Sequence, residues 1–263
     1  MVNRPVLIAQ ISDLHVMPPG ELAFGRFDTS ASLARCINHI MQLKPWPDAV
    51  LATGDLVDGG SAGEYRHLRH LLAPLAMPVY VIPGNHDERE VLCGEFGDHP
   101  YLPRPGQMVR YVVENHGVRL VALDTAVTGE DGGALGADQL DWLDAMLGAE
   151  LQKRTLVFMH HPPVKTGTRY MDEIALDQPS ARRLAQIIGR HPQVERITCG
   201  HVHRGMHARW HGTTVSICPS TAFQYSLDFR PDAPAAVTGE PPAYQLHYWN
   251  GAELVTHTVA VMP

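Results

Sequence analysis

The chain has 263 residues, a formal net charge of −7 and an ordinary globular composition, with 44% hydrophobic and 19% charged residues. This length fits one large domain, and we expect residues 1–263 to fold as a single unit. The negative charge argues against a broad basic surface for extended nucleic acid. No apolar run approaches the roughly 18 residues that span a bilayer, so no membrane segment is expected.

The cysteines and the N-terminal residues predict a cytoplasmic protein. Cysteines occur at four scattered positions without any paired spacing: Cys36, Cys93, Cys199 and Cys218. Such a pattern is typical of reduced, buried thiols. Residues 1–5 lead directly into a strand-like segment, which leaves no room for a secretory signal. The sequence is compatible with a homo-oligomer but leaves the oligomeric state undetermined.

The N-terminal part of the chain predicts alternating buried strands and helices. Short apolar runs typical of buried strands occur at 6–11, 48–53 and 79–82. Segments with apolar residues at helical spacing follow them, at about 30–43, 61–75 and up to residue 96. Asp28 or Ser30 is a candidate cap for the first helix, and the second begins at Ser61 or Ala62. This alternation favours parallel strands joined by crossover helices.

Beyond residue 99 the pattern becomes mixed. We expect a hairpin at 109–114 and 118–124, and further strands at 156–159 and 194–199. Helices are expected at 137–147 and 180–190, with a long loop at 165–178. From about residue 206 the chain predicts mainly antiparallel strands, at 206–217 and 243–261. A proline-rich irregular segment, 229–242, lies between them.

Polar side chains follow five of the predicted strands at the point where each strand ends. The clearest case is the turn after residue 82, which delivers Asn85, His86 and Asp87 together behind a Pro-Gly pair. The other strand ends carry Asp13 with His15, Asp55, His160, and His201 with His203. The carboxyl ends of strands are where open α/β sheets bind ligands.

These residues suit a metal site better than any other chemistry. A lone histidine at a strand end is more often a core residue, and Asp55 alone could simply cap the next helix. Five such strand ends on one sheet are hard to explain in that way. Carboxylates, imidazoles and an amide oxygen suit transition metals, and seven potential ligands are enough for two ions that share a carboxylate.

The motifs, in this order, resemble those of the calcineurin-like metallophosphoesterase family. They are Asp13-x-His15, Gly54-Asp55-x-x-Asp58-x-Gly60, Gly84-Asn85-His86-Asp87, His160 and Gly200-His201-x-His203. Segments 82–87 and 158–163 are similar to those of bacterial class III cyclic-nucleotide phosphodiesterases and the related glycerophosphodiesterases. The resemblance implies an α/β fold of four layers (αββα), in which two mixed β-sheets are flanked by helices.

The resemblance also implies which residues hold two metal ions. One ion would be held by Asp13, His15, Asp55 and His203. The second would be held by Asp55, Asn85, His160 and His201, so that Asp55 is the bridge. His86 would be the catalytic residue beside the ions. The sequence does not identify the metals, because iron, manganese, zinc and cobalt all suit this ligand set.

Two ions about 3.5–4 Å apart lower the pKa of a bridging water and clamp a phosphoryl oxygen. The expected reaction is therefore in-line attack of a metal-bridging hydroxide on phosphorus. His86 is placed to stabilise the developing charge or to protonate the leaving oxygen. We also expect Asp58 to hydrogen-bond His86 and fix its tautomer. The alternative for Asp58 is an ordinary turn aspartate before Gly59.

Aromatic residues in two loops predict the walls of a site for small phosphodiesters. Loops 16–27 and 221–229 contain Phe24, Phe27, Phe223, Tyr225 and Phe229, of which Phe24, Phe223 and Tyr225 are the substrate-binding candidates. Each of them taken singly is more often a core residue. We expect 3′,5′-cyclic nucleotides slightly ahead of glycerophosphodiesters. A phosphomonoesterase, a nuclease and a non-catalytic scaffold of the same fold are the alternatives, although a scaffold is expected to have lost some ligands.

Overall fold

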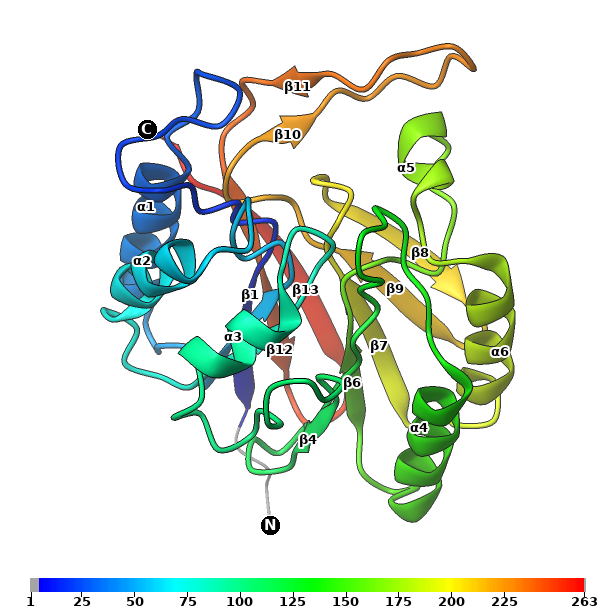
Figure 1. Ribbon diagram of the computed structural model, residues 1–263. Coiled ribbons are helices and arrows are strands. Elements are labelled where there is room, and N and C mark those ends of the chain that lie inside the picture. The colour runs from blue at the N-terminus through cyan, green and yellow to red at the C-terminus, as the bar shows by residue number, and fades with distance from the viewer. Residues whose placement is uncertain (1–4, 263) are drawn as a thin grey trace.

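The computed structural model describes residues 5–262, which form two large β-sheets with helices on their outer sides and one small two-stranded sheet (Figure 1). The strands of the first sheet are β1 (Val6–Ile11), β2 (Ala49–Thr53), β3 (Val79–Ile82), β12 (Ala243–Trp249) and β13 (Leu254–Ala260). They are ordered β13-β12-β1-β2-β3. β1, β2 and β3 are parallel, as the strand–helix alternation predicts, and β12 pairs antiparallel with β1.

Three helices cover the outer face of the first sheet: α1 (Thr29–Gln42), α2 (Ala62–Leu72) and α3 (Arg89–Glu95). Asp28 caps α1, since its carboxylate accepts a hydrogen bond from the Ala31 amide at 2.8 Å. Ser61 and Glu64 form a capping box at the start of α2. Both helix starts agree with the prediction.

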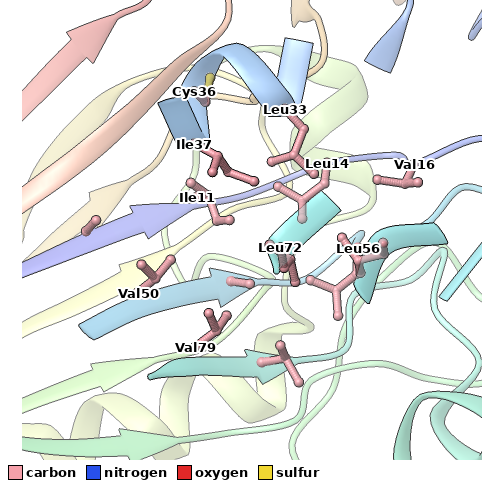
Figure 2. Close-up of a cluster of buried hydrophobic side chains, with 14 of the residues drawn as sticks. Ile11, Leu14, Val16, Leu33, Cys36, Ile37, Val50, Leu56, Leu72 and Val79 are labelled. Atoms are coloured by element: carbon pink, nitrogen blue, oxygen red, sulfur yellow. The ribbon is translucent and has the colours of Figure 1, made fainter. Parts of the chain in front are cut away.

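Figure 2 shows the apolar contact between these helices and the first sheet. Leu33 and Ile37 of α1 lie over Ile11 of β1, and all three side chains are buried. Fully burying one side chain of this kind stabilises the fold by about 1.5–3 kcal/mol. This layer therefore holds the ends of β1 and β2 in place, where the polar motifs begin.

The strands of the second sheet are β4 (Tyr111–Val113), β5 (Arg119–Ala122), β6 (Thr155–Phe158), β7 (Val194–Cys199), β8 (Met206–Trp210) and β9 (Thr213–Ile217). They are ordered β4-β5-β6-β7-β9-β8, with β5, β6, β7 and β9 parallel. On its outer face lie α4 (Ala137–Ala149) and α6 (Gln178–Ile188). The predicted four-layer fold class, two mixed sheets flanked by helices, is confirmed.

The space between the two sheets is filled by apolar side chains and one buried polar network. Ile8, Leu51 and Phe158 belong to the apolar part. The Gln10 amide of β1 donates to the Thr53 hydroxyl of β2 at 2.9 Å and to the Cys199 carbonyl of β7 at 3.0 Å, so it ties the first sheet to the second. Buried polar groups are tolerated here because they are hydrogen-bonded to one another.

Two predictions about loops are wrong in part. Segment 165–178, expected to be a loop, contains the short helix α5 (Arg169–Glu173), which is too brief to show helical periodicity. Segment 229–242, expected to be irregular, contains β11 (Val237–Thr238), which pairs with β10 (Gln224–Tyr225) in a projecting arm (Figure 1). Two-residue strands leave no alternating pattern in a sequence.

Candidate metal centre

The predicted metal ligands lie together at the carboxyl ends of β1, β2, β3, β6 and β7. Ligand atoms of Asp13, His15, Asp55 and His203 all lie within 4.8 Å of one another. Those of His160 and His201 form a second such group together with His161. All of these side chains are buried, and Asn85 is half-buried beside them.

The backbone turns sharply at five of the predicted ligands. Positive φ angles occur at Asp13 (51°), His15 (42°), Asp55 (47°), His201 (70°) and His203 (54°). A non-glycine residue in this region costs of order 1–3 kcal/mol and persists where the surroundings hold it. The neighbouring turns hold each other, because the His15 amide donates to the Asp55 carbonyl at 2.9 Å. These turns direct the side chains of the predicted ligands toward one another.

On one side of the site two imidazole nitrogens face each other. Nδ1 of His203 lies 2.7 Å from the Phe223 carbonyl, to which it must donate, so Nε2 of a neutral ring carries a lone pair. Nδ1 of His15 lies 3.0 Å from the Asp58 carboxylate and donates there in the same way. The two Nε2 atoms are only 3.1 Å apart. Two lone pairs at this distance repel each other unless a cation lies between them.

The other side of the site repeats this arrangement. Nδ1 of His160 donates to the Thr53 carbonyl at 2.7 Å, so its Nε2 lone pair faces Oδ1 of Asn85 at 3.2 Å. Nδ1 of His201 also lies near the Asn85 oxygen, at 3.1 Å. Three acceptor atoms therefore converge on one position.

Asp55 lies between the two positions. Its Oδ2 is 3.6 Å from Nε2 of His15, and its Oδ1 is 3.4 Å from Nε2 of His160. Gly84 leaves room for this carboxylate, since a Cβ there would lie 2.3 Å from Oδ1 of Asp55. The geometry of Asp55 is the one expected of a shared ligand.

The donor set fits two metal ions. Converging donors 3.1–3.6 Å apart have the separation of neighbouring ligands around one ion whose bonds are about 2.0–2.2 Å long. Neutral imidazoles with free lone pairs, carboxylates and an amide oxygen are ligands for transition metals. The residues could thus hold a dinuclear metal site.

Burial and charge set the protonation of these groups. Burial, together with the neighbouring His160, lowers the pKa of His201 to about 3 and so keeps its lone pair available. Burial also lowers the pKa of His203 well below its usual range. Burial disfavours the charged forms of both His160 and Asp55, but their mutual attraction raises the pKa of His160 to about 9 and holds that of Asp55 well below its usual value. The shared carboxylate is therefore ionised. A metal ion bound there would take the place of the Nε2 proton of His160 and leave the ring neutral.

His86 lies beside this centre and is 39% exposed. Its Nδ1 donates to the main-chain carbonyl of Asp58 at 2.9 Å. The predicted contact with the Asp58 carboxylate is different in the structure: Oδ1 is 3.8 Å from His86 and instead binds His15. The turn after β2 brings the carbonyl, rather than the side chain, to His86. Asp58 still fixes the tautomer of His86, and its carboxylate orients His15.

Only some of the aromatic residues predicted to bind substrate are exposed at the site. Phe24 is 63% exposed at the rim, whereas Phe223 is only 2% exposed. The Phe223 ring lies 4.7 Å from His203 and 5.2 Å from His15, behind the metal ligands. Tyr225 is half-buried, with its ring 5.0 Å from His203.

Of the two further aromatics, one joins this cluster. Phe27 packs on Phe223 with ring centroids 5.5 Å apart. Phe229 lies in the projecting arm, 64% exposed and close to Gly167. The loops near the site carry more aromatics than the rim exposes, because Phe223 packs against the predicted ligands and Phe27 packs on Phe223.

Two further groups at the centre, the half-buried Asp87 and the buried His161, were not assigned a role from the sequence. The Asp87 carboxylate accepts hydrogen bonds from the amides of Leu56 and Gly84 and from the Tyr65 hydroxyl, and so shapes the turn that carries Asn85. Burial and the Asp55 charge raise the pKa of Asp87 to about 6. His161 packs beside the ligands, and its only sequence signal is that it directly follows His160.

Comparison with known proteins decides the family. A sequence model of the calcineurin-like phosphoesterases matches residues 6–205, the part of the chain that contains every motif. The chain belongs to the calcineurin-like phosphoesterase family. The family predicted from the motifs is confirmed.

Curated relatives within this family are named as phosphodiesterases. A probable glycerophosphodiester phosphodiesterase GpdQ of Arcobacter nitrofigilis is 39% identical over 96% of this chain and 92% of its own length. A 3′,5′-cyclic adenosine monophosphate phosphodiesterase CpdA of Pseudomonas aeruginosa is 32% identical over 88% of this chain and 82% of its own. The similarity to each of these two relatives extends over most of this chain.

Solved structures share the fold. A dimetal phosphatase from Danio rerio superposes with a TM-score of 0.65, covering 98% of this chain and 99% of its own at 16% identity. A purple acid phosphatase from Lupinus luteus reaches a TM-score of 0.71, covering 98% of this chain and 52% of its own at 14% identity. At 14–16% identity these comparisons establish a shared fold and nothing more.

Proposed function

We propose that this protein is a dinuclear metal phosphodiesterase that hydrolyses small phosphodiesters. The observation that carries the proposal is the convergence of lone pairs at two positions on either side of Asp55. One position would be formed by Asp13, His15, Asp55 and His203, and the other by Asp55, Asn85, His160 and His201. When bound, two such ions activate a water and offset phosphoryl charge.

His86 is the proposed general acid. Its Nδ1 proton is held by the Asp58 carbonyl, which leaves Nε2 to deliver a proton to the leaving oxygen. Burial acts to lower the pKa of His86, but the Asp55 carboxylate and the Asp58 carbonyl outweigh this, so the pKa is raised. This raised pKa favours the doubly protonated ring, which is the form that a general acid needs. Asp58 supports the step by holding both His86 and His15 in place.

The rim of the site supports an organic ester group on either side of phosphorus. Phe24, freely exposed, and Tyr225, half-buried, offer faces on which a base can stack, while Phe223 supports the ligands from behind. We propose 3′,5′-cyclic nucleotides as the preferred substrates. Glycerophosphodiesters are the second candidate, because Phe223 is withdrawn from the rim and the relative at 39% identity is named for that substrate.

A comparison of diester with monoester tests the proposal. With added manganese, we expect a higher kcat/KM for bis(p-nitrophenyl) phosphate than for p-nitrophenyl phosphate. A panel of cyclic AMP, cyclic GMP and glycerophosphodiesters then ranks the natural diesters. A phosphomonoester that surpasses every diester would overturn the assignment, and a complete lack of turnover would indicate a scaffold.

We also propose a cytoplasmic location. The four cysteines are free and buried, as expected of a reducing compartment. Within residues 5–262, no helix combines the length and apolar character needed to cross a bilayer.

A further inference from the structure

His161 directly follows β6 and is fully buried next to the proposed ligands. Its ring centroid lies 4.5 Å from that of His201, with the planes inclined at 50°. The distance to the His160 ring is 4.8 Å, in an edge-on arrangement at 87°. His161 thus contacts two ligands of the same proposed ion, the one on the Asn85 side.

Both ring nitrogens of His161 are already hydrogen-bonded. Nε2 lies 3.1 Å from the main-chain carbonyl of Asp131, which can only accept, so this nitrogen carries the proton. Nδ1 lies 2.8 Å from the Thr125 hydroxyl and accepts its proton. The same hydroxyl oxygen accepts from the His161 amide at 3.2 Å. His161 therefore has no lone pair left for a metal ion and no free proton for a substrate.

The loop around Gly133 is fitted to this ring. A Cβ at Gly133 would lie 2.4 Å from Cγ of His161, so only glycine allows the close approach. The Gly133 amide donates to the Ala175 carbonyl at 3.3 Å, and its carbonyl accepts from the Asp177 amide at 2.9 Å. The loop that contacts the ring is consequently tied to segment 175–177.

The proposed ligand His201 differs from the other three imidazoles in one respect. The others have their outer nitrogen fixed by a hydrogen bond: His15 by Asp58, His160 by the Thr53 carbonyl and His203 by the Phe223 carbonyl. The outer nitrogen of His201 is Nε2, which is buried and makes no hydrogen bond among the described residues. The Ile174 carbonyl acts on it and favours the protonated form of the ring, but this contact does not meet the geometry of the hydrogen bonds that fix the other three imidazoles. Ring rotation of His201 must then be restricted by packing, and the face of His161 supplies it.

We propose that His161 is a positioning residue whose clamped ring fixes the rotation of the His201 imidazole. In that orientation Nδ1 of His201 points to the position it shares with Asn85. This inference rests on the proposed dinuclear site and concerns only one of its two ions. The other ion, near Asp13, His15 and His203, has its imidazoles fixed by hydrogen bonds and does not depend on His161.

The test compares two substitutions of similar volume. His161→Phe keeps a flat ring, and His161→Leu removes it. Co²⁺ is titrated into the metal-free full-length protein, with calorimetry reporting the two affinities and the visible d–d spectrum reporting ligand geometry. His203→Ala and His201→Ala identify which step belongs to which ion.

We expect His161→Leu to weaken only the ion on the Asn85 side, by about 10–100-fold, the usual loss when the support of a ligand is removed. Its d–d spectrum changes. His161→Phe keeps a flat ring but loses both hydrogen bonds that hold it, so it weakens this ion less than His161→Leu does. The inference is overturned if both ions weaken equally, if neither changes, or if His161→Phe loses the ion as fully as His201→Ala, which would make His161 a ligand.

A milder variant covers the case in which His161→Leu does not fold. Thr125→Val removes the hydroxyl that holds Nδ1 and leaves the ring in place. A selective weakening of the same ion by severalfold supports the inference, and unchanged affinity for both ions contradicts it. A wild-type protein that binds fewer than two ions would refute the dinuclear site itself, and the role of His161 with it.

Discussion

Each histidine at this site has one ring nitrogen that faces the proposed metal position and one that faces away from it. The nitrogen that faces away matters as much as the other. Nδ1 of His15, His160 and His203 each has an acceptor, and this contact decides that Nε2 is the free lone pair. A third carbonyl, that of Asp58, plays the same part for His86 as those of Thr53 and Phe223 do for His160 and His203. The protonation of each imidazole is thus set by an oxygen on the side away from the proposed ions.

His86→Ala is the sharpest single change. His86 is not part of either converging group of metal donors around Asp55, so we expect two ions to remain bound. Turnover of a diester should fall by roughly 10²–10⁴, the range for a lost general acid. Metal analysis and kcat are measured together, with the exposed His70→Ala as the control. Loss of metal in His86→Ala would place His86 among the ligands.

Asp58→Asn separates the two contacts of Asp58. The amide oxygen still accepts from Nδ1 of His15, so metal content is expected to be unchanged. The Asp58 charge helps to raise the pKa of His86. Removing that charge lowers the pKa of His86, so His86 loses its acid proton at a lower pH. The alkaline limb of the kcat–pH profile therefore shifts to lower pH. Asp58→Ala, which also releases His15, should lose turnover outright. An alkaline limb that stays in place in Asp58→Asn would show that the charge does not act on His86.

At the scale of elements, the site is formed where parallel strands end and turn. The turns after β1, β2 and β7 have positive φ angles at their predicted ligands, and the turn after β3 contains Gly84. The predicted ligands are far apart in the sequence because a helix separates one parallel strand from the next. Each such crossover returns the chain so that the next strand ends at the same edge of the sheet.

Gly84→Ala tests how closely these turns are packed. The new Cβ would lie 2.3 Å from Oδ1 of Asp55 and 2.8 Å from Nε2 of His160, so both ligands must move. We expect the protein to fold but to bind metal at least tenfold more weakly. Gly94→Ala is the matched control, because a Cβ there meets nothing within 4 Å and a helical alanine is favourable. Equal metal affinity in the two variants would mean that the turn can relax without loss.

The strand ends could be predicted from the sequence because period, motif order and capping residues all agree there. Asp28, Ser61 and the motif residues were identified on this basis. The direction of the Asp58 side chain could not be predicted, because the backbone conformation of this one residue decides whether its carbonyl or its carboxylate meets His86. Nor could the burial of Phe223, since a lone aromatic in a loop has no periodic pattern to reveal its face.

For the whole molecule, the C-terminal strands complete the first sheet. β12 pairs with β1 along the register from Val6–Trp249 to Gln10–Gln245, so residues from the two ends of the chain share one sheet. Tyr244 of β12 is fully buried in the same cluster as α1, and its hydroxyl lies 2.8 Å from Nδ1 of His39. We therefore propose that residues 1–263 fold as a single domain.

Tyr244→Ala tests this proposal. Removing a buried aromatic costs about 3–5 kcal/mol of the free energy of unfolding. We expect the unfolding midpoint to fall equally by circular dichroism, by tryptophan fluorescence and by loss of bound metal. Tyr248→Ala on the same strand, where the side chain is 37% exposed, should change it little. A separate early transition confined to the C-terminal strands would indicate a second folding unit.

The central claim is that two metal ions held around Asp55 carry out diester hydrolysis. The most direct measurement is the metal content per chain, determined together with turnover of bis(p-nitrophenyl) phosphate as metal is returned to the chelated protein. We predict that activity rises only as two ions bind, and that Asp55→Ala binds neither ion firmly and remains inactive. Turnover at the native rate by fully demetallated protein would contradict the account.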